Sequence, residues 1–217
     1  MSSRLNRFNW LARHYDSIAR LIFGKAIYDS QANFLSLIPP HSRVLIIGGG
    51  SGEILALLMK LYPSCKICYV EASSEMLSMA EKRMPQKVIS TVTFIHGTEK
   101  AIPEGMVFDA IITNFFLDLF PEKYVLKIGK ELRDKLNRGG MWLVSDFVDG
   151  GKLWQRMLLW IMYRFFVITC NIEGTSLPSW ETQLRMAGMK KKEEQLFFGE
   201  FIKSIVYQKD NGYSDGS

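Results

Sequence analysis

The chain has 217 residues, of which 47% are hydrophobic and 23% are charged, and its formal net charge is +5 at pH 7. This length is most simply one domain with a substantial core, and the composition is that of a globular rather than a disordered or fibrous protein. Three cysteines, an odd number, argue against a disulfide framework and for a reducing compartment. The polar, basic start carries no secretory signal pattern, so we expect a cytoplasmic protein.

Residues 4–38 are predicted to form helices ahead of the first strand. Apolar side chains recur there at helical spacing, and Gly24 interrupts the pattern. Because this segment precedes the first strand, it has to pack outside an α/β core. We interpret it as a helical cap, with simple amphipathic packing as the alternative.

Residues 43–60 organise the rest of the chain. An apolar run over residues 43–47 predicts a buried parallel strand, glycines follow at positions 48, 50 and 52, and residues 53–60 have a helical pattern. Such a strand, glycine turn and helix bring backbone N–H groups up to a ligand. A dinucleotide-binding loop would carry its third glycine at position 53, where Glu53 would repel a pyrophosphate. The loop therefore favours a ligand whose polar part is not a phosphate.

The next predicted strand, over residues 66–71, ends in an acid. Glu71 follows Gly48 by 23 residues. In a βαβ unit, an acid at this place accepts hydrogen bonds from the hydroxyl groups of a ribose. Loop and acid together predict a nucleoside site. The alternative is a tight turn with a solvated glutamate.

The later elements continue the alternation of strands and helices. Strands are predicted over residues 91–95, 108–114 and 141–147, helices over residues 74–84, 122–137 and 178–188, and two short β runs over residues 194–198 and 201–208. Gly139 and Gly140 are predicted to end the second of these helices. The strand ends converge on one edge, where an open α/β sheet binds its ligand.

Residues 44–52 and 70–77 resemble motifs I and II of the class I S-adenosylmethionine-dependent methyltransferases, nearest to small-molecule members such as those of quinone biosynthesis. The resemblance covers residues 10–208. It implies an α/β fold: a Rossmann-like three-layer sandwich whose seven-stranded, mostly parallel sheet has the order 3-2-1-4-5-7-6, with strand 7 antiparallel. It divides this single domain, residues 1–217, into a helical cap (1–38), a cofactor-binding core (42–149), a substrate-covering insertion (150–176) and a final helix with a β-hairpin (177–209). Residues 210–217 are expected to be a disordered tail.

The resemblance also implies S-adenosyl-L-methionine as the cofactor. The glycine loop would pass under its methionine part, Glu71 would hold the ribose and Ala72 would neighbour the adenine. The cofactor-binding residues implied are Tyr15, Gly48, Gly49, Gly50, Gly52, Glu71, Ala72, Met76, Thr98, Glu99, Asn114 and Phe115. No metal site is expected, because the C-x-x-C spacing of Cys65 and Cys68 has no second pair and no histidine nearby.

Two positions depart from the family pattern. Ile46 stands where strand one usually carries an acid, and Thr98, followed by Glu99, stands where an acid usually follows the glycine after strand three. The apolar strand one also resembles that of spermidine synthases, which transfer an aminopropyl group, although residues 114–118 lack their paired aspartates. An aminopropyltransferase and a non-catalytic binding subunit of the same fold are therefore the alternatives to a methyltransferase.

Residues 152–168 are rich in aromatic residues and methionine. Gln155, Arg156 and Arg164 interrupt the stretch, which argues against a membrane span. The family places its substrate-covering insertion here, so we expect a roof over an apolar pocket, with a core or dimer-contact helix as the alternative. Its uncompensated cations also suit an acidic or interface-bound amphiphile.

The function predicted is transfer of a methyl group to the oxygen or carbon of a small, largely apolar or aromatic acceptor. A base would remove a proton from a hydroxyl or carbon acid. The candidates are His14, Asp118, Asp146 and, last, His96. A specific nucleic-acid partner is not expected, because the tip of strand four lacks the two prolines of an Asn-Pro-Pro-aromatic loop. Peripheral membrane contact and a homodimer are both left open.

Overall fold

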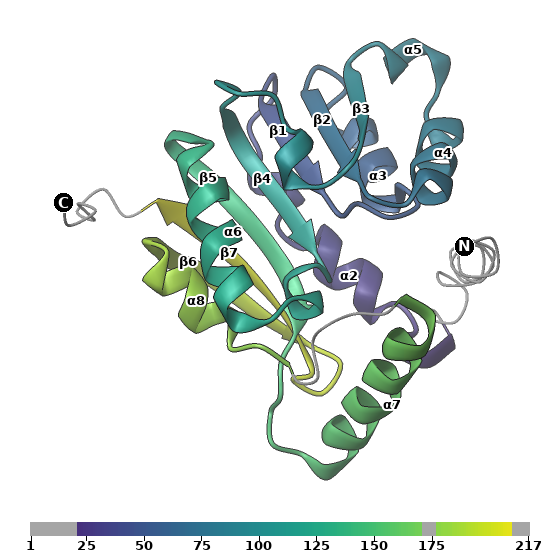
Figure 1. The fold of residues 1–217 in the computed structure, drawn as a ribbon. Helices are drawn as coiled ribbons and strands as arrows, with labels where there is room; N and C mark the ends of the chain where they lie inside the picture. Colours follow the sequence, from purple (N-terminus) through teal and green to yellow (C-terminus); the bar gives the residue numbers. More distant parts are fainter. Residues whose placement is uncertain (1–20, 171–176, 210–217) are drawn as a thin grey trace.

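The computed structural model describes residues 21–170 and 177–209 (Figure 1). The tail predicted over residues 210–217 and the first part of the predicted cap lie outside these ranges. The described elements are α2 (Ala26–Ala32), η1 (Leu35–Leu37), β1 (Arg43–Ile47), α3 (Glu53–Leu61), β2 (Lys66–Glu71), α4 (Ser74–Arg83), α5 (Gln86–Ile89), β3 (Val92–His96), η2 (Glu99–Ala101), β4 (Phe108–Asn114), η3 (Leu117–Leu119), α6 (Glu122–Asp134), β5 (Leu136–Phe147), α7 (Leu153–Cys170), α8 (Trp180–Met186), β6 (Met189–Phe197) and β7 (Ile202–Lys209).

One seven-stranded sheet runs through the molecule in the order β3-β2-β1-β4-β5-β7-β6. Strands β1 to β5 pair in parallel, and β7 is antiparallel to both β5 and β6. The predicted order is thus confirmed. The carboxyl ends of the parallel strands meet at one edge, the lower edge in Figure 1.

Helices cover both faces of the sheet. On one face, Val125, Ile128 and Leu132 of α6 join Trp180 and Leu184 of α8 in a buried cluster. On the other face, α3 and α4 contribute apolar side chains to a second cluster. The central strands are buried on both sides, because each face is covered by helices, and this explains their continuous apolar runs.

The boundary between α6 and β5 differs from the prediction. The helix ends at Asp134 rather than at residue 137, and β5 already pairs with β4 at Leu136. The register then shifts before Met141, so Gly139, with a φ of 77°, lies in a bulge of the strand and does not end the helix. Likewise β6 begins at Met189, five residues before the predicted run.

Helix α7 is set apart from the three layers, beside the carboxyl ends of the parallel strands (Figure 1). A third apolar cluster joins it to the sheet, with Phe147 from the end of β5, Leu159 from α7 and Phe201 from the β6–β7 hairpin. Phe23, which precedes α2, completes the contact. Among the described residues, no helix is long and apolar enough to cross a membrane.

Candidate functional site

In the glycine loop between β1 and α3, Gly48 and Gly49 are closely packed against aromatic rings, whereas Gly50 faces open space. A Cβ atom at Gly48 would lie 2.6 Å from the Phe116 ring, and one at Gly49 would lie 2.4 Å from the Tyr69 ring. At Gly50, whose φ is 65°, the same atom would meet only the Met76 sulfur, at 3.9 Å. The backbone of Gly50 therefore faces space that a ligand can enter, while its neighbours are held in place.

Glu71, the last residue of β2, ties this loop to the next one. Its side chain is 8% exposed, its Oε2 accepts a hydrogen bond from the Gly50 N–H at 2.9 Å, and its Oε1 accepts one from the Ser73 N–H at 2.8 Å. The Tyr69 hydroxyl donates to the Gly50 carbonyl at 2.8 Å. Each carboxylate oxygen keeps a lone pair for a further donor. The acid is thus buried, ionisable and positioned beside the open side of Gly50.

The tip of β3 carries the residues predicted to face an adenine. Thr98 is exposed and caps η2, where its hydroxyl accepts from the Lys100 N–H at 3.5 Å. Glu99 is buried and accepts a hydrogen bond from the Tyr124 hydroxyl at 2.7 Å, which raises the pKa of Tyr124 to about 12. The pair links η2 to α6, so the structure shows Glu99 in a structural contact and Thr98 at the surface.

His96, the last of the base candidates, has a structural partner. Its Nε2 lies 3.0 Å from the Ala72 carbonyl oxygen, within hydrogen-bond distance. This contact joins the tips of β2 and β3. Ala72 itself is exposed at the end of β2, and Met76 is half-buried in the first turn of α4.

The tip of β4 turns sharply into the site. Asn114 ends the strand half-buried, and Phe115 follows with a φ of 49°, a value that residues with side chains seldom adopt. The Phe115 N–H donates to the Ser145 carbonyl at 2.7 Å, and its ring lies 4.7 Å from that of Phe147. Backbone strain at a strand tip is typical of functional sites. Here the unusual backbone conformation places the Phe115 ring against the third apolar cluster, the one that joins α7 to the sheet.

Asp146 of β5 holds the turn that follows. It has no exposed surface, and its carboxylate accepts four backbone hydrogen bonds, from Phe116 at 3.3 Å, Leu117 at 2.9 Å, Asp118 at 3.3 Å and Phe147 at 2.9 Å. Four donors on one carboxylate fix the loop between β4 and α6. This loop is the one whose Phe116 ring packs against Gly48.

Asp118 lies beside Asp146 in the same buried pocket of the fold. Burial and the neighbouring carboxylate raise the pKa of Asp118 well above its usual value, and burial raises the pKa of Asp146 to about 6. The two carboxyl groups form a side-chain hydrogen bond with each other, and such a bond requires one proton on the pair. The sequence placed these two acids at one sheet edge, and the structure brings them into contact.

Comparison with known proteins identifies the domain. Residues 44–140 match the family model described as "Methyltransferase domain". The malonyl-[acyl-carrier protein] O-methyltransferase of Priestia megaterium is 29% identical over 66% of this chain and 51% of its own length. The demethylmenaquinone methyltransferase of Thermotoga maritima is 25% identical over 92% of this chain and 95% of its own. Residues 44–140 are thus similar to a methyltransferase domain, and the predicted resemblance to the class I S-adenosylmethionine-dependent methyltransferases is confirmed.

Solved structures show the same fold as this methyltransferase domain. A family 2 O-methyltransferase from Planctomyces limnophilus, in complex with apigenin, matches with a TM-score of 0.68 and 16% identity over 91% of this chain and 61% of its own. CalO1, a methyltransferase of calicheamicin biosynthesis in its S-adenosylhomocysteine-bound form, matches with a TM-score of 0.65 and 15% identity over 90% and 56%. This chain spans about half the length of the first curated relatives that it matches.

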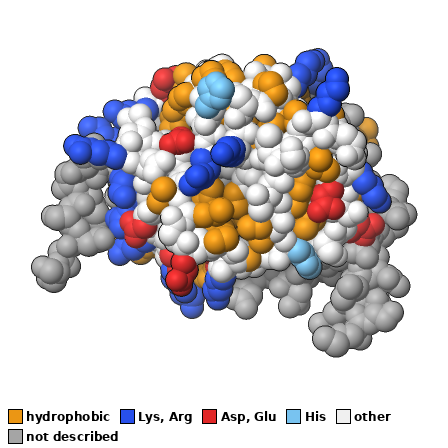
Figure 2. Space-filling view, turned by 90° about the horizontal axis from the view of Figure 1, so that it is seen from above, with side chains coloured by type: hydrophobic (Ala, Val, Ile, Leu, Met, Phe, Trp, Pro, Cys, Tyr) orange, Lys and Arg blue, Asp and Glu red, His pale blue; other side chains and the backbone are white. Residues whose placement is uncertain are grey.

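A separate cavity of about 360 Å³ lies at the opposite edge of the methyltransferase sheet. It is lined by Pro39, Pro40, His41, Ser42, Asp109, Arg138, Gly139, Gly140 and Met141. These residues surround the amino ends of β1 and β4, away from the glycine loop. Figure 2 looks onto this edge, where side chains of both charges are interspersed with hydrophobic ones. The cavity is therefore distinct from the site described above.

Several predicted residues lie elsewhere or outside the described part of the chain. His14 and Tyr15 fall outside the described residues, so their roles stay predictions. Cys65 and Cys68 are buried beside and within β2. Within residues 21–170 and 177–209, no cluster of three or more His, Cys, Asp and Glu side chains is arranged to hold a metal ion.

Sequence reasoning missed the aromatic cluster between the strand ends and α7. Its rings come from Phe23, Phe115, Phe147, Trp154, Phe198 and Phe201. Phe198 and Phe201 belong to the β6–β7 hairpin, far in sequence from the rest. The only signal was the density of aromatic residues in each segment, because no spacing rule joins segments that meet through the fold.

Proposed function

We propose that this protein transfers a methyl group from S-adenosylmethionine to an oxygen or carbon of a small, largely apolar acceptor. The observation that carries the proposal is a juxtaposition at one sheet edge. A buried carboxylate clamps the glycine loop, and the loop touches the Phe115–Phe116 turn, which leads into the aromatic cluster. The glycine loop and an aromatic cluster, which we infer to be the wall of an acceptor chamber, thus share one boundary.

The described residues fit the cofactor. Gly50 leaves open the space beside the loop, and the Glu71 oxygens retain lone pairs for two ribose hydroxyls. The Met76 sulfur, which would lie 3.9 Å from a Cβ atom at Gly50, offers an apolar contact to the cofactor. When bound, the cofactor supplies a methyl group on a positively charged sulfur. Glu71 holds its ribose in a fixed position, because two backbone N–H groups already orient the carboxylate.

The aromatic cluster suits an apolar acceptor. Phe147 and Phe201 are buried with ring centroids 5.1 Å apart, and Trp154 of α7 lies 5.7 Å from Phe201. Such walls exclude water from an acceptor and align it against the cofactor side of the chamber. The name of one relative, demethylmenaquinone methyltransferase, supports the same class of acceptor.

Asp146 and Asp118 fit a positioning role better than that of a base. Asp146 is fully buried and accepts four backbone hydrogen bonds, and it shares a proton with Asp118. By ordering the Phe115–Asp118 turn, they place Phe115 at the border between the glycine loop and the chamber. Asp118 is also buried, so it offers a polyamine no exposed carboxylate, which weighs against aminopropyl transfer.

Calorimetric titration with S-adenosylmethionine and S-adenosylhomocysteine tests the cofactor half of the proposal. We expect the wild type to bind both, and Glu71→Ala to weaken binding on the order of 100-fold, since two charge-assisted hydrogen bonds are lost. Glu193→Ala, an exposed acid on β6, is the matched control and should bind like the wild type. Absence of binding by the wild type would overturn the methyltransferase proposal, and equal binding by both variants would overturn the role of Glu71.

The acceptor half is tested by methyl transfer to panels of phenols, quinols and polyamines. We expect product only with the apolar aromatic compounds, because the chamber wall is aromatic. Transfer to polyamines in preference to phenols and quinols would contradict the assigned acceptor class.

A further inference from the structure

Helix α7 exposes a continuous apolar face. Leu153, Met157, Trp160 and Ile161 are 84%, 62%, 63% and 48% exposed. Their spacing of four, three and one residues places them on one side of a helix. The opposite side packs inward, where Leu159 joins the aromatic cluster. The described part of the helix is therefore apolar on both faces, and its outer face is not covered by the aromatic cluster.

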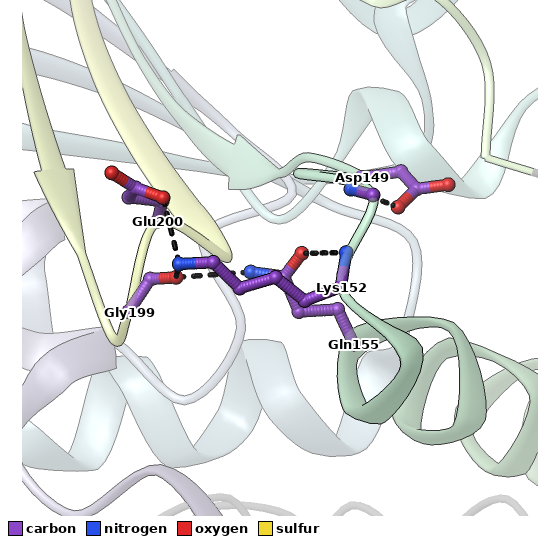
Figure 3. Close-up of polar contacts among 6 residues, drawn as sticks. Asp149, Lys152, Gln155, Gly199 and Glu200 are labelled. Atoms are coloured by element: carbon purple, nitrogen blue, oxygen red, sulfur yellow. Dashed lines mark hydrogen bonds and ion pairs between the residues drawn. The ribbon is translucent and has the colours of Figure 1, made fainter.

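The start of α7 is fastened to the β6–β7 hairpin (Figure 3). Lys152 donates to the Gly199 carbonyl at 3.0 Å and to the Glu200 carboxylate at 2.7 Å. Gln155, which has no exposed surface, donates to the same Gly199 carbonyl at 3.0 Å. These contacts hold the first turn in one orientation. The exposed face is thus presented by a fixed support and does not result from a loosely placed helix.

The charge of residues 150–172 indicates which kind of surface binds the exposed face of α7. Residues 150–172 contain Lys152, Arg156 and Arg164 and no acidic residue. Two of these cations meet acids at the first turn of the helix: Arg156 lies 3.6 Å from Asp149, and Lys152 lies 2.7 Å from Glu200. Exposed Leu, Trp and Met beside cations, with no carboxylate, are the features of a helix that lies in the plane of a lipid interface. Trp favours that boundary in particular.

We propose that the outer face of α7 docks on the surface of an anionic lipid bilayer. Met157, Trp160 and Ile161 enter the interface, while Arg156, whose side chain is 67% exposed, remains at the level of the lipid phosphates. No helix of the described residues could span the bilayer, so the contact is peripheral. The net charge of +5 adds a general attraction to anionic lipid. This inference goes beyond methyl transfer and does not depend on it.

Sedimentation with phosphatidylcholine vesicles, with and without phosphatidylglycerol, tests the proposal. We expect the wild type to bind the vesicles that contain phosphatidylglycerol. Met157→Glu should weaken binding about tenfold or more, because a carboxylate replaces buried apolar surface and repels anionic lipid. Met186→Glu on α8 is the matched control: Met186 is 50% exposed, and its change to Glu should alter binding less than about twofold.

A second pair of variants tests the electrostatic part. Arg156→Gln should weaken binding about fivefold, the effect of one cation at an anionic surface. Lys127→Gln, an exposed cation on α6 far from α7 in sequence, should leave binding unchanged. Thermal unfolding and titration with S-adenosylmethionine on every variant verify that the fold is intact. Vesicle binding needs neither cofactor nor acceptor, so its failure and that of the proposed function are distinguishable.

Three results would overturn the proposal. The first is no binding of the wild type to either kind of vesicle, and the second is an equal loss in Met157→Glu and Met186→Glu. The third is a dimer of the wild type, seen by light scattering, that Met157→Glu abolishes while vesicle binding is absent. That result would assign the face to a second copy of the chain. Equal binding to vesicles with and without phosphatidylglycerol would overturn the role of Arg156.

Discussion

The carboxyl ends of the parallel strands form one edge of the sheet, and the two ends of this edge are built in opposite ways. At the β1–β2 end, the loop is closely packed and its polar atoms are paired, with Glu71 and Tyr69 holding the Gly50 peptide from both sides. At the α7 end, large apolar side chains lie at the surface, and polar contacts hold the first turn of the helix. The cofactor side is therefore set by backbone geometry, whereas the acceptor side is set by side chains on a separately supported helix.

The difference suggests which side tolerates change. A site made of backbone N–H groups and glycines loses its shape with any added atom, whereas an apolar chamber adapts by repacking. If the proposed function holds, the cofactor side should tolerate fewer substitutions than the acceptor side. The variants below measure how rigid each end is.

The largest effect is expected from Gly52→Ala. A Cβ atom there would lie 2.8 Å from the Ala80 Cβ and 2.9 Å from its Cα, at a φ of 85°. Steric conflict with α4 adds to the cost of the left-handed backbone, so chemical denaturation should show a loss of about 3 kcal/mol. Gly105→Ala is the matched control, with a φ of 74° and no atom within 4 Å, and should lose about 1 kcal/mol. Equal losses would show that packing against α4 is not the reason for Gly52.

The acid pair predicts an unusual dependence of stability on pH. Burial raises the pKa of Asp146 to about 6, and burial with the neighbouring carboxylate raises the pKa of Asp118 well above its usual value, so the native state holds more protons than the unfolded chain above about pH 4. The free energy of unfolding should therefore fall as pH rises through 6, by about 2 kcal/mol between about pH 5 and about pH 8.

Asp118→Asn isolates this contribution. The amide keeps a donor toward Asp146 and adds no charge, so the fall above pH 5 should shrink. Denaturation at several pH values measures it. Glu122, Glu194 and Glu200, whose pKa values are lowered by hydrogen bonds, act only at lower pH and with the opposite sign. An unchanged slope in the variant would contradict the shared proton.

Gln155→Ala tests whether α7 depends on its anchor. The variant removes one of the two donors to the Gly199 carbonyl, the buried one, so hydrogen exchange of the α7 amides should accelerate about tenfold, which corresponds to about 1.4 kcal/mol. Affinity for S-adenosylmethionine should change less than about twofold, because the glycine loop is not touched. Gln183→Ala on α8 is the control. A large loss of cofactor affinity would show that the two ends are not independent.

The smallest effect is expected from Tyr124→Phe. Loss of the phenol leaves one oxygen of the buried Glu99 without this donor, and the free energy of unfolding should fall by about 1 kcal/mol. If Glu99 serves mainly to join η2 to α6, affinity for the cofactor stays within about threefold. Calorimetry decides the point, and a loss beyond tenfold would assign Glu99 to the adenine.

The central strands and the glycine loop could be predicted from the sequence with little error. Strands β1, β2 and β4 are predicted with their observed ends, because a strand that is buried on both faces has a mostly apolar sequence. The end of α6 could not be predicted in this way. Its last turn and the bulge at Gly139 depend on the pairing of Leu136 with Phe108, a contact between residues far apart in the sequence.

The candidate site shows the same division. Spacing alone brought Glu71 to the glycine loop, because one helical crossover joins the two strands and leaves a single arrangement. The charged or neutral state of Asp118 could not be predicted, because it depends on Asp146, 28 residues later on the neighbouring strand. The sequence predicted that residues 152–168 form a roof over an apolar pocket, but not which side of this helix faces outward.

Local pattern by itself determined the strand, the glycine turn, the helix and the acid at the tip of β2, because each depends on residues within one βαβ unit. Tertiary structure alone decided which polar atoms pair with Glu71, that two acids share a proton, and which side of α7 meets the core. These outcomes depend on burial, and burial is set by segments such as β5 and the β6–β7 hairpin that reach the site only when the sheet is complete.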